Sequence, residues 1–221
     1  MKKCILIFFF LTSKGFSLDL TEIDRIQNWE LLQNRPVKVE WTIYQEYPIS
    51  RAEKVLNHNI NIIASKIEDI ENYPNIFKRV TSTERLDENI IQVVLNLPFP
   101  FSGRDYVINY FKETLDDGSW IFMFSSIKHP KARLRKNTVR LPNAAGMWIL
   151  KPLSENHTKV IYAWNGELLG NFPDVGLTRA WITQGTEVLT WLDESIELKR
   201  TNETIFTIST FVYFKSRSHF T

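Results

Sequence analysis

Six strand-like segments follow one another between residues 79 and 168, and one long amphipathic segment comes after them. The strand-like segments are 79–86, 89–97, 104–115, 118–127, 137–150 and 157–168. Short turns such as Asp116–Gly118 join most of them, so we expect neighbouring strands to pair antiparallel. The amphipathic segment 174–199 carries Leu177, Trp181 and Val188 on one helical stripe. A long antiparallel sheet and one such helix bury both apolar faces if the sheet curls around the helix, with an apolar cavity between them.

The residues before this array contribute further elements. The apolar spacing of Leu20–Gln33 predicts a helix, and alternation predicts a strand at 37–47 and a weaker strand at 51–61. Residues 62–78 are expected to be helical, with a break at Tyr73–Pro74. The expected fold class is therefore α+β: a helix-grip architecture, in which a curved antiparallel β-sheet wraps around a long C-terminal helix and encloses a hydrophobic cavity.

The two ends of the chain differ from its centre. A positive start, a short apolar run and a small, polar stretch predict a cleaved signal peptide at 1–17, and hence a secreted or periplasmic protein. The alternative is an apolar element of a cytoplasmic domain. Residues 18–199 form the expected domain. The extension at 200–221 contains a β-prone run, 205–214, for which disorder, an edge strand and a docking segment remain open.

Composition and motifs give little support for catalysis. The chain carries 27 basic and 25 acidic residues, so bulk charge does not favour nucleic acid or an acidic substrate. The histidines, His58, His129, His157 and His219, lack the spacing of a metal site, and none adjoins a Ser or Cys nucleophile pattern. The sequence also lacks a phosphate loop and a nucleotide fingerprint. We expect no cofactor, no nucleic-acid partner and a monomer.

Four motifs occur in an order that is characteristic of one family. They are "LPFPFSGRDYV" (97–107), "DDGSW" (116–120), "VRLPNAAGMWILKPL" (139–153) and "TKVIYAWNGELLGNFP" (158–173). With them, residues 20–198 resemble the START (lipid-transfer) domain family of the helix-grip superfamily. The resemblance implies a deep cavity that holds one lipid or sterol, with binding or transfer and without chemistry. An enzyme of the wider superfamily, such as a polyketide cyclase, aromatase or hydrolase working in the same cavity, is the alternative.

Strand and helix parity identify the side chains expected to face this cavity and bind the ligand. They are Ile91, Val93, Leu95, Tyr106, Ile108, Tyr110, Met123, Trp148, Trp164, Leu177, Trp181, Gln184 and Val188. The segment 118–127 is apolar on both faces, so its parity stays open, and its outer face requires a cover if only one face meets the cavity. The inward-facing set contains few polar groups, mainly Tyr110 and Gln184, which favours a carrier over an enzyme.

One departure from the family bears on the ligand. Many members bury an acid–arginine pair, and Ile91 and Tyr110 align with those two positions. A hydroxyl group donates one hydrogen bond but does not grip a phosphate. We therefore expect a sterol, fatty acid or similar mostly apolar ligand.

The segment "KHPKARLRKN" (128–137) carries five cations and no acid. It is either an ordinary solvated loop or a lid near the cavity mouth that docks on anionic membrane. In the second interpretation Lys131, Arg133, Arg135 and Lys136 approach the surface, each contributing about 1 kcal/mol, and Leu134 enters the interface. Arg104, Asp105 and Arg140 are expected to have structural roles, in ion pairs or as caps of carbonyl groups.

Overall fold

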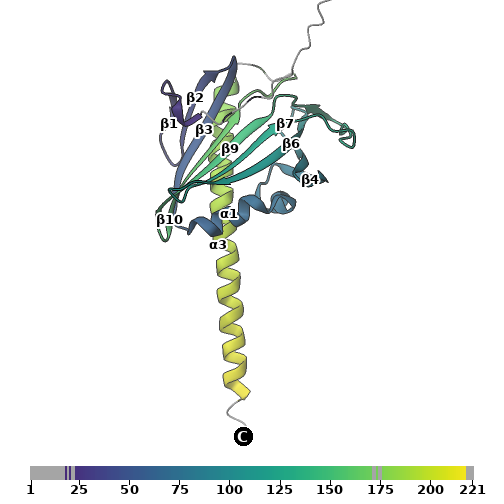
Figure 1. Cartoon of the computed structure of the whole chain (residues 1–221). Helices are drawn as coiled ribbons and strands as arrows, with labels where there is room; N and C mark the ends of the chain where they lie inside the picture. Colours follow the sequence, from purple (N-terminus) through teal and green to yellow (C-terminus); the bar gives the residue numbers. More distant parts are fainter. Residues whose placement is uncertain (1–17, 19, 21–22, 171–172, 174–175, 218–221) are drawn as a thin grey trace, which may run out of the picture.

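The protein is described by a computed structural model for residues 18, 20, 23–170, 173 and 176–217 (Figure 1). In this part of the chain ten strands form one sheet of order β1-β2-β3-β10-β9-β7-β6-β5-β4, and β8 pairs with β6. The strands are β1 (Glu30–Gln33), β2 (Lys38–Tyr44), β3 (Tyr47–Leu56), β4 (Val80–Asp87), β5 (Ile90–Leu95), β6 (Gly103–Thr114), β7 (Trp120–Ser126), β8 (Thr138–Arg140), β9 (Ala145–Ser154) and β10 (His157–Asn165). The short β8 lies parallel to β6, and the other pairs are antiparallel.

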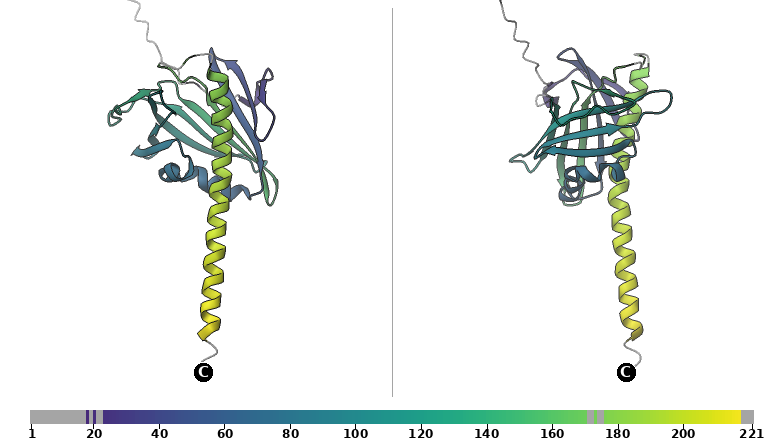
Figure 2. Two further views of the ribbon diagram at one scale, coloured as in Figure 1. Left: turned by 180° about the vertical axis from the view of Figure 1, so that it is seen from behind. Right: turned by 90° about the vertical axis from the view of Figure 1, so that its right-hand side faces the viewer.

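A single long helix, α3 (Leu177–Arg217), crosses the concave face of the sheet (Figure 2). The helices α1 (Ile60–Glu68) and α2 (Tyr73–Ile76), with the 3-10 turn η2 (Ile70–Asn72), connect β3 to β4. This arrangement confirms the expected helix-grip fold. The predicted signal peptide, 1–17, lies outside the described residues.

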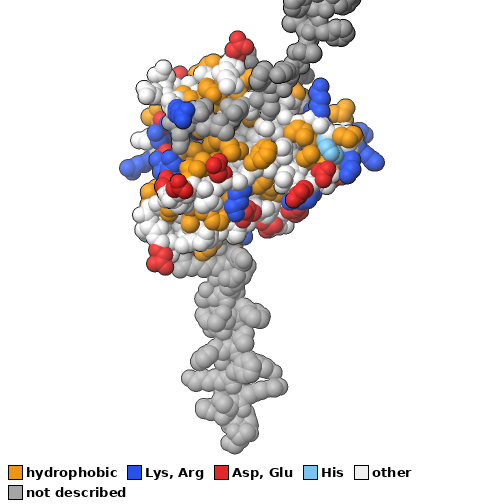
Figure 3. Space-filling model, viewed as in Figure 1, with side chains coloured by type: hydrophobic (Ala, Val, Ile, Leu, Met, Phe, Trp, Pro, Cys, Tyr) orange, Lys and Arg blue, Asp and Glu red, His pale blue; other side chains and the backbone are white. Residues whose placement is uncertain are grey.

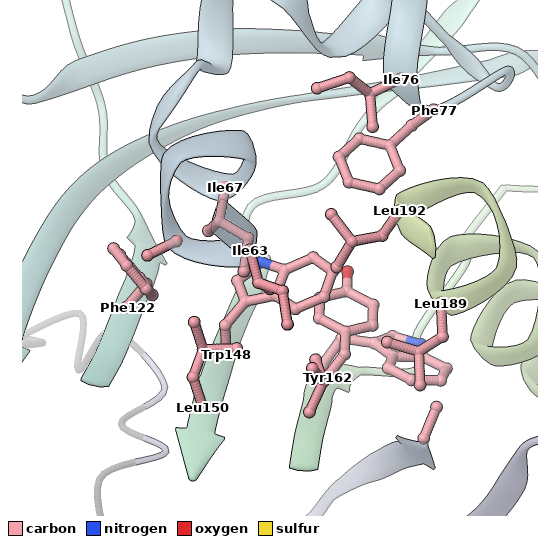
Figure 4. Close-up of a cluster of buried hydrophobic side chains, with 14 of the residues drawn as sticks. Ile63, Ile67, Ile76, Phe77, Phe122, Trp148, Leu150, Tyr162, Leu189 and Leu192 are labelled. Carbon is pink, nitrogen blue, oxygen red and sulfur yellow. The ribbon is translucent and has the colours of Figure 1, made fainter. Parts of the chain in front are cut away.

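The main hydrophobic core lies between α3 and the concave face of the sheet (Figure 4). Leu189 and Leu192 of α3 are fully buried and point toward Trp148 and Tyr162 on β9 and β10. The side chain of Ile63, from α1, approaches the same group. Each fully buried aliphatic side chain of this size contributes about 1.5–3 kcal/mol. Burial at this interface therefore holds α3 on the sheet.

A second core on the convex face settles the parity of β7. Trp120, Phe122 and Phe124 belong to the concave core, whereas Ile121 and Met123 pack against the convex cluster. That cluster is completed by Leu18, Leu20 and Ile23 from the N-terminal segment. Both faces of β7 are apolar because each one is covered, by the concave core on one side and by the convex cluster with its N-terminal residues on the other.

The predicted helix Leu20–Gln33 was wrong. The described part of that segment contains only the 3-10 turn η1 (Ile23–Arg25) and the edge strand β1. Leu20 and Ile23 bury themselves in the convex cluster, whereas Leu32 packs against the concave core. A helix has one apolar stripe, so it cannot bury side chains on two opposite faces of a sheet. The segment instead passes around the edge of the sheet and ends as the edge strand β1.

The bounds of several other strands and helices also differ from those predicted. The predicted strand 137–150 divides into β8 and β9 around the turn at Pro142, and the predicted strand 51–61 corresponds to β3, which ends at Leu56. The helical stretch 62–78 breaks at Asp69, and Tyr73–Pro74 instead begins α2. The β-prone tail is helical as far as Arg217, where disorder or an edge strand was considered. None of the helices in the described part of the chain combines the length and hydropathy needed to cross a bilayer.

Gly185 permits a close approach of α3 to the sheet. A Cβ atom at this position would lie 2.8 Å from Ala52 Cβ, 3.1 Å from the Trp164 ring and 3.3 Å from Val39. A glycine inside a helix normally costs about 1 kcal/mol relative to alanine, so this one is retained against its propensity because of the packing.

We expect Gly185→Ala to destabilise the protein by about 1–3 kcal/mol, because overpacking against β2, β3 and β10 outweighs the gain in helix propensity. Urea unfolding of the variant measures the change. Thr178→Ala, at an exposed site near the start of the same helix, is the control and should leave stability unchanged or slightly raised. A more stable Gly185→Ala variant would contradict the packing argument.

Candidate ligand-binding cavity

A cavity of about 400 Å³ lies between α3 and the concave face of the sheet. Its walls come from β4, β5, β6, β7, β9 and β10, from the residues before β4, and from the first four turns of α3. Its lining is mostly aliphatic and aromatic. Such a volume and lining are typical of a site for one small hydrophobic molecule.

Most of the residues predicted to face the cavity line it. They are Val93, Leu95, Tyr106, Ile108, Tyr110, Trp148, Trp164, Gln184 and Val188. The alternation along β5, β6 and β10 was therefore assigned to the correct faces. Ligand contact by these side chains remains a prediction.

Four of the predicted residues lie elsewhere among the described side chains. Met123 faces the convex cluster, because its strand is covered on both sides. Ile91 is on the concave face but packs inside the core, and Leu177 packs against the edge of that core. Trp181 is buried, donates its indole N–H to the Gly166 carbonyl at 2.8 Å, and packs against Trp41. Trp181 therefore fixes the start of α3 and is not part of the cavity wall.

Four tyrosines contribute phenol groups to the cavity: Tyr73, Tyr106, Tyr110 and Tyr162. Burial raises the pKa of each one, and that of Tyr162 reaches about 12 although a hydrogen bond with Gln184 opposes the rise. Tyr73 donates to the Ile67 carbonyl at 2.6 Å. Sequence reasoning missed Tyr73 and Tyr162. The parity that selected Trp164 also places Tyr162 inward, so that signal was present.

An ion pair in the cavity wall was not predicted. Arg79 Nε lies 2.5 Å from Glu187 Oε2, and Arg79 Nη2 lies 2.7 Å from Oε1, so the contact is bidentate. Both residues line the cavity. The expectation that Tyr110 and Gln184 supply most of its polar groups was therefore incomplete. Arg79 precedes β4 and Glu187 lies on α3, and pattern analysis of one segment at a time does not bring them together.

Arg104 has the structural role predicted for it. Its guanidinium is buried and donates to the carbonyl oxygens of Ser102, Gly103, Leu168 and Leu169. Burial lowers the pKa of this group. The contacts join the loop before β6 to the loop after β10, and both loops contribute to the cavity wall.

Asp105 and Arg140 also have the predicted structural role. The two side chains form an ion pair at 2.6 Å, and Gln92 donates to the same carboxylate at 2.8 Å. The group lies on the opposite face of β5 and β6 from the cavity-lining Val93 and Tyr106.

No residue of the basic loop 128–137 is part of the cavity wall, and the expected place of this loop near the cavity mouth remains a prediction. Lys131 donates to the Leu86 carbonyl at 3.2 Å, Arg135 pairs with Glu84, and the Arg133 carbonyl accepts from Gln92. Gln92 faces the convex side, so the loop covers the outside of the sheet. Leu134 is 78% exposed.

The described residues contain no group of three His, Cys, Asp or Glu side chains suited to a metal ion. The buried His58 contacts Asp193 at 3.0 Å and Glu197 at 3.4 Å, both on α3. It thus forms part of the attachment of the helix to the sheet.

Comparison with known proteins agrees with this architecture. The family model for the START domain matches residues 27–189. The STAR-related lipid transfer protein from Xanthomonas axonopodis (fragment 25–204) is similar in structure, with a TM-score of 0.67 and 21% identity over 77% of this chain and 99% of that one. Human StAR-related lipid transfer protein 5 has a TM-score of 0.68 and 15% identity over 81% of this chain and 91% of that one. At these identities the likeness shows the fold alone.

One relative in sequence matches only a part of this chain. An uncharacterised protein from Pseudomonas aeruginosa is 32% identical over 84 residues, which is 36% of this chain. The match covers 39% of that relative, so the chain spans about two-fifths of its length.

We expect the buried phenols to make the protein sensitive to alkali. The pKa of Tyr162 is about 12 in the folded protein against 10.0 for the free side chain. Its contribution to stability is therefore complete below about pH 10 and is lost as the pH rises from 10 to 12, because the unfolded chain ionises first. Tyrosinate absorbance and circular dichroism, followed together, should show that the buried tyrosines ionise only as the protein unfolds. Ionisation of all tyrosines near pH 10 with the fold intact would contradict this.

Proposed function

This chain belongs to the START domain family, and from that premise we propose that it binds a single lipid-type ligand, a sterol, fatty acid or related lipid, and transfers it between membranes without chemical change. The observation that carries the proposal is the cavity of about 400 Å³ roofed by α3. An apolar space of this size enclosed by a helix suits a molecule that is poorly soluble in water.

The partners and protonation states of the ionisable groups in the cavity wall favour a lipid carrier over an enzyme. Acid–base catalysis requires positioned groups that are able to exchange protons near the substrate. Arg79 and Glu187 neutralise each other, and Arg104 is held by carbonyl groups. The pKa values of the phenols are raised by burial, so these groups remain neutral at physiological pH. The alternative function is an enzyme that works in the same cavity.

The loop between β5 and β6 supplies a route by which lipid enters. Leu97, Pro98 and Phe101 line the cavity, whereas Phe99 is 97% exposed. An exposed aromatic side chain next to the cavity is suited to contact with the membrane interface. We propose that Phe99 inserts there while the loop opens.

The basic loop remains a second proposed membrane contact. Lys and Arg side chains gather at the right-hand edge of the view in Figure 3, where the loop between β7 and β8 lies in Figure 1. Lys131 and Arg135 already have protein partners, so Arg133, Lys136 and the exposed Leu134 are the side chains that best reach a surface.

Native mass spectrometry of the protein purified from its host tests the function. We expect one lipid per chain, with an unaltered structure. An empty protein that also fails to extract lipid from vesicles would contradict the carrier, and recovery of a chemically altered molecule would favour the enzyme. The mass of the polypeptide also tests the proposed export, because removal of residues 1–17 should accompany export. The mass of the intact native species shows whether the protein is a monomer.

We expect Phe99→Ser to slow lipid transfer between vesicles by about tenfold, because burying a phenylalanine in an apolar phase contributes about 1.5–3 kcal/mol. Lipid already bound should be retained, since Phe99 is not part of the cavity wall. Leu134→Ser is the matched variant in the basic loop. A larger loss in Leu134→Ser, seen only with anionic vesicles, would assign the main membrane contact to residues 131–136.

A further inference from the structure

On the concave face of the sheet, one row of paired residues across β2, β3 and β10 carries three buried polar atoms that lack a hydrogen-bond partner among the described residues. Trp41 on β2 lies opposite Ser50 on β3, and Ser50 lies opposite Trp164 on β10. The unpartnered atoms are Trp41 Nε1, Ser50 Oγ and Trp164 Nε1. Residues directly opposite in a sheet point to the same face, so these groups are neighbours beneath α3.

Of the three residues in this row, Trp164 forms part of the cavity wall, and its side chain is only 3% exposed. Trp41 is covered by Trp181, with ring centroids 5.1 Å apart, and Trp164 stacks on Tyr162 at 4.9 Å. The indole of Trp164 is thus fixed between a neighbouring ring and the close approach of α3 at Gly185. A molecule in the cavity contacts this indole before it reaches Ser50 or Trp41.

The chemistry of these atoms specifies what would satisfy them. An indole N–H only donates, and a hydroxyl group turns to donate or accept. Tyr110 Oη, also in the cavity wall, is a further buried group that has no hydrogen-bond partner within the described part of the chain. Buried donors left unpaired are costly, so the complementary molecule carries an acceptor oxygen.

The charged groups of the cavity indicate that this oxygen is neutral. Arg79 is neutralised by Glu187, and Arg104 is directed to four carbonyl groups. Arg179 is exposed where it meets the cavity, so it remains accessible to water. A carboxylate or phosphate buried beside Trp164 would lack a free cation, which is unfavourable.

We propose that the ligand is a neutral lipid whose carbonyl or hydroxyl oxygen accepts a hydrogen bond from Trp164 Nε1. The inference rests on the proposed lipid-binding function and narrows it: free fatty acids and phospholipids bind less well than esters, alcohols or sterol-like molecules.

The test uses probes with one hydrocarbon chain and different ends: hexadecane, methyl hexadecanoate, 1-hexadecanol and hexadecanoate. Displacement of Nile red from the full chain measures their affinities. We expect the ester and the alcohol to bind about tenfold more tightly than hexadecane, as one added hydrogen bond provides, and more tightly than the anion. Equal binding of ester and hydrocarbon, or preference for the anion, would overturn the proposal. If no probe displaces the dye and no lipid co-purifies, the carrier function itself is contradicted.

Trp164→Phe keeps an aromatic ring and removes the donor, so it should abolish the preference for the ester over hexadecane. Trp120→Phe, on β7 and outside the cavity wall, is the matched control and should retain the preference. In the wild-type protein, the assigned indole N–H resonance of Trp164 should move downfield with methyl hexadecanoate and not with hexadecane. This measurement does not depend on the folding of a variant, and an unchanged resonance would also overturn the proposal.

Discussion

The contact between α3 and the concave face of the sheet determines the rest of the structure. Gly185 lets the helix approach Ala52 and Trp164, and the buried Leu189 and Leu192 continue the contact along the helix. The cavity lies between the same helix and the concave face of the sheet. The helix is therefore both a core element and the roof of the site.

Three ion pairs add to this attachment, and in each of them the acidic residue lies on α3. Acidic residues on α3 meet basic residues from the sheet side: Glu187 with Arg79, Asp193 with Lys54, and Glu194 with Lys78. The Lys78–Glu194 pair is exposed, and such a pair contributes at most about 1 kcal/mol and weakens in salt. The other two pairs are half-buried, and the apolar burial of Leu189 and Leu192 adds to the attachment of the helix.

Periodicity along single segments was sufficient to predict the sheet, its helix and nine of the side chains that line the cavity, because period 2 in a strand and the helical repeat in α3 fix which side chains share a face. It failed where one segment serves two faces, as between Leu20 and Leu32, and where both faces are covered, as at Met123. The Arg79–Glu187 pair joins residues 108 positions apart. Their meeting depends on the curvature of the sheet and the placement of α3, which a local pattern does not encode.

The length of α3 has a mechanical consequence. Its last described buried residue is Ile196, and the helix continues without a break to Arg217, beyond the sheet (Figure 2). That projecting part is about 30 Å long at 1.5 Å per residue. The helix that roofs the cavity is thus continuous with an unbroken arm that lies outside the domain. Anything that holds this arm is therefore coupled to the roof of the cavity through a single helix.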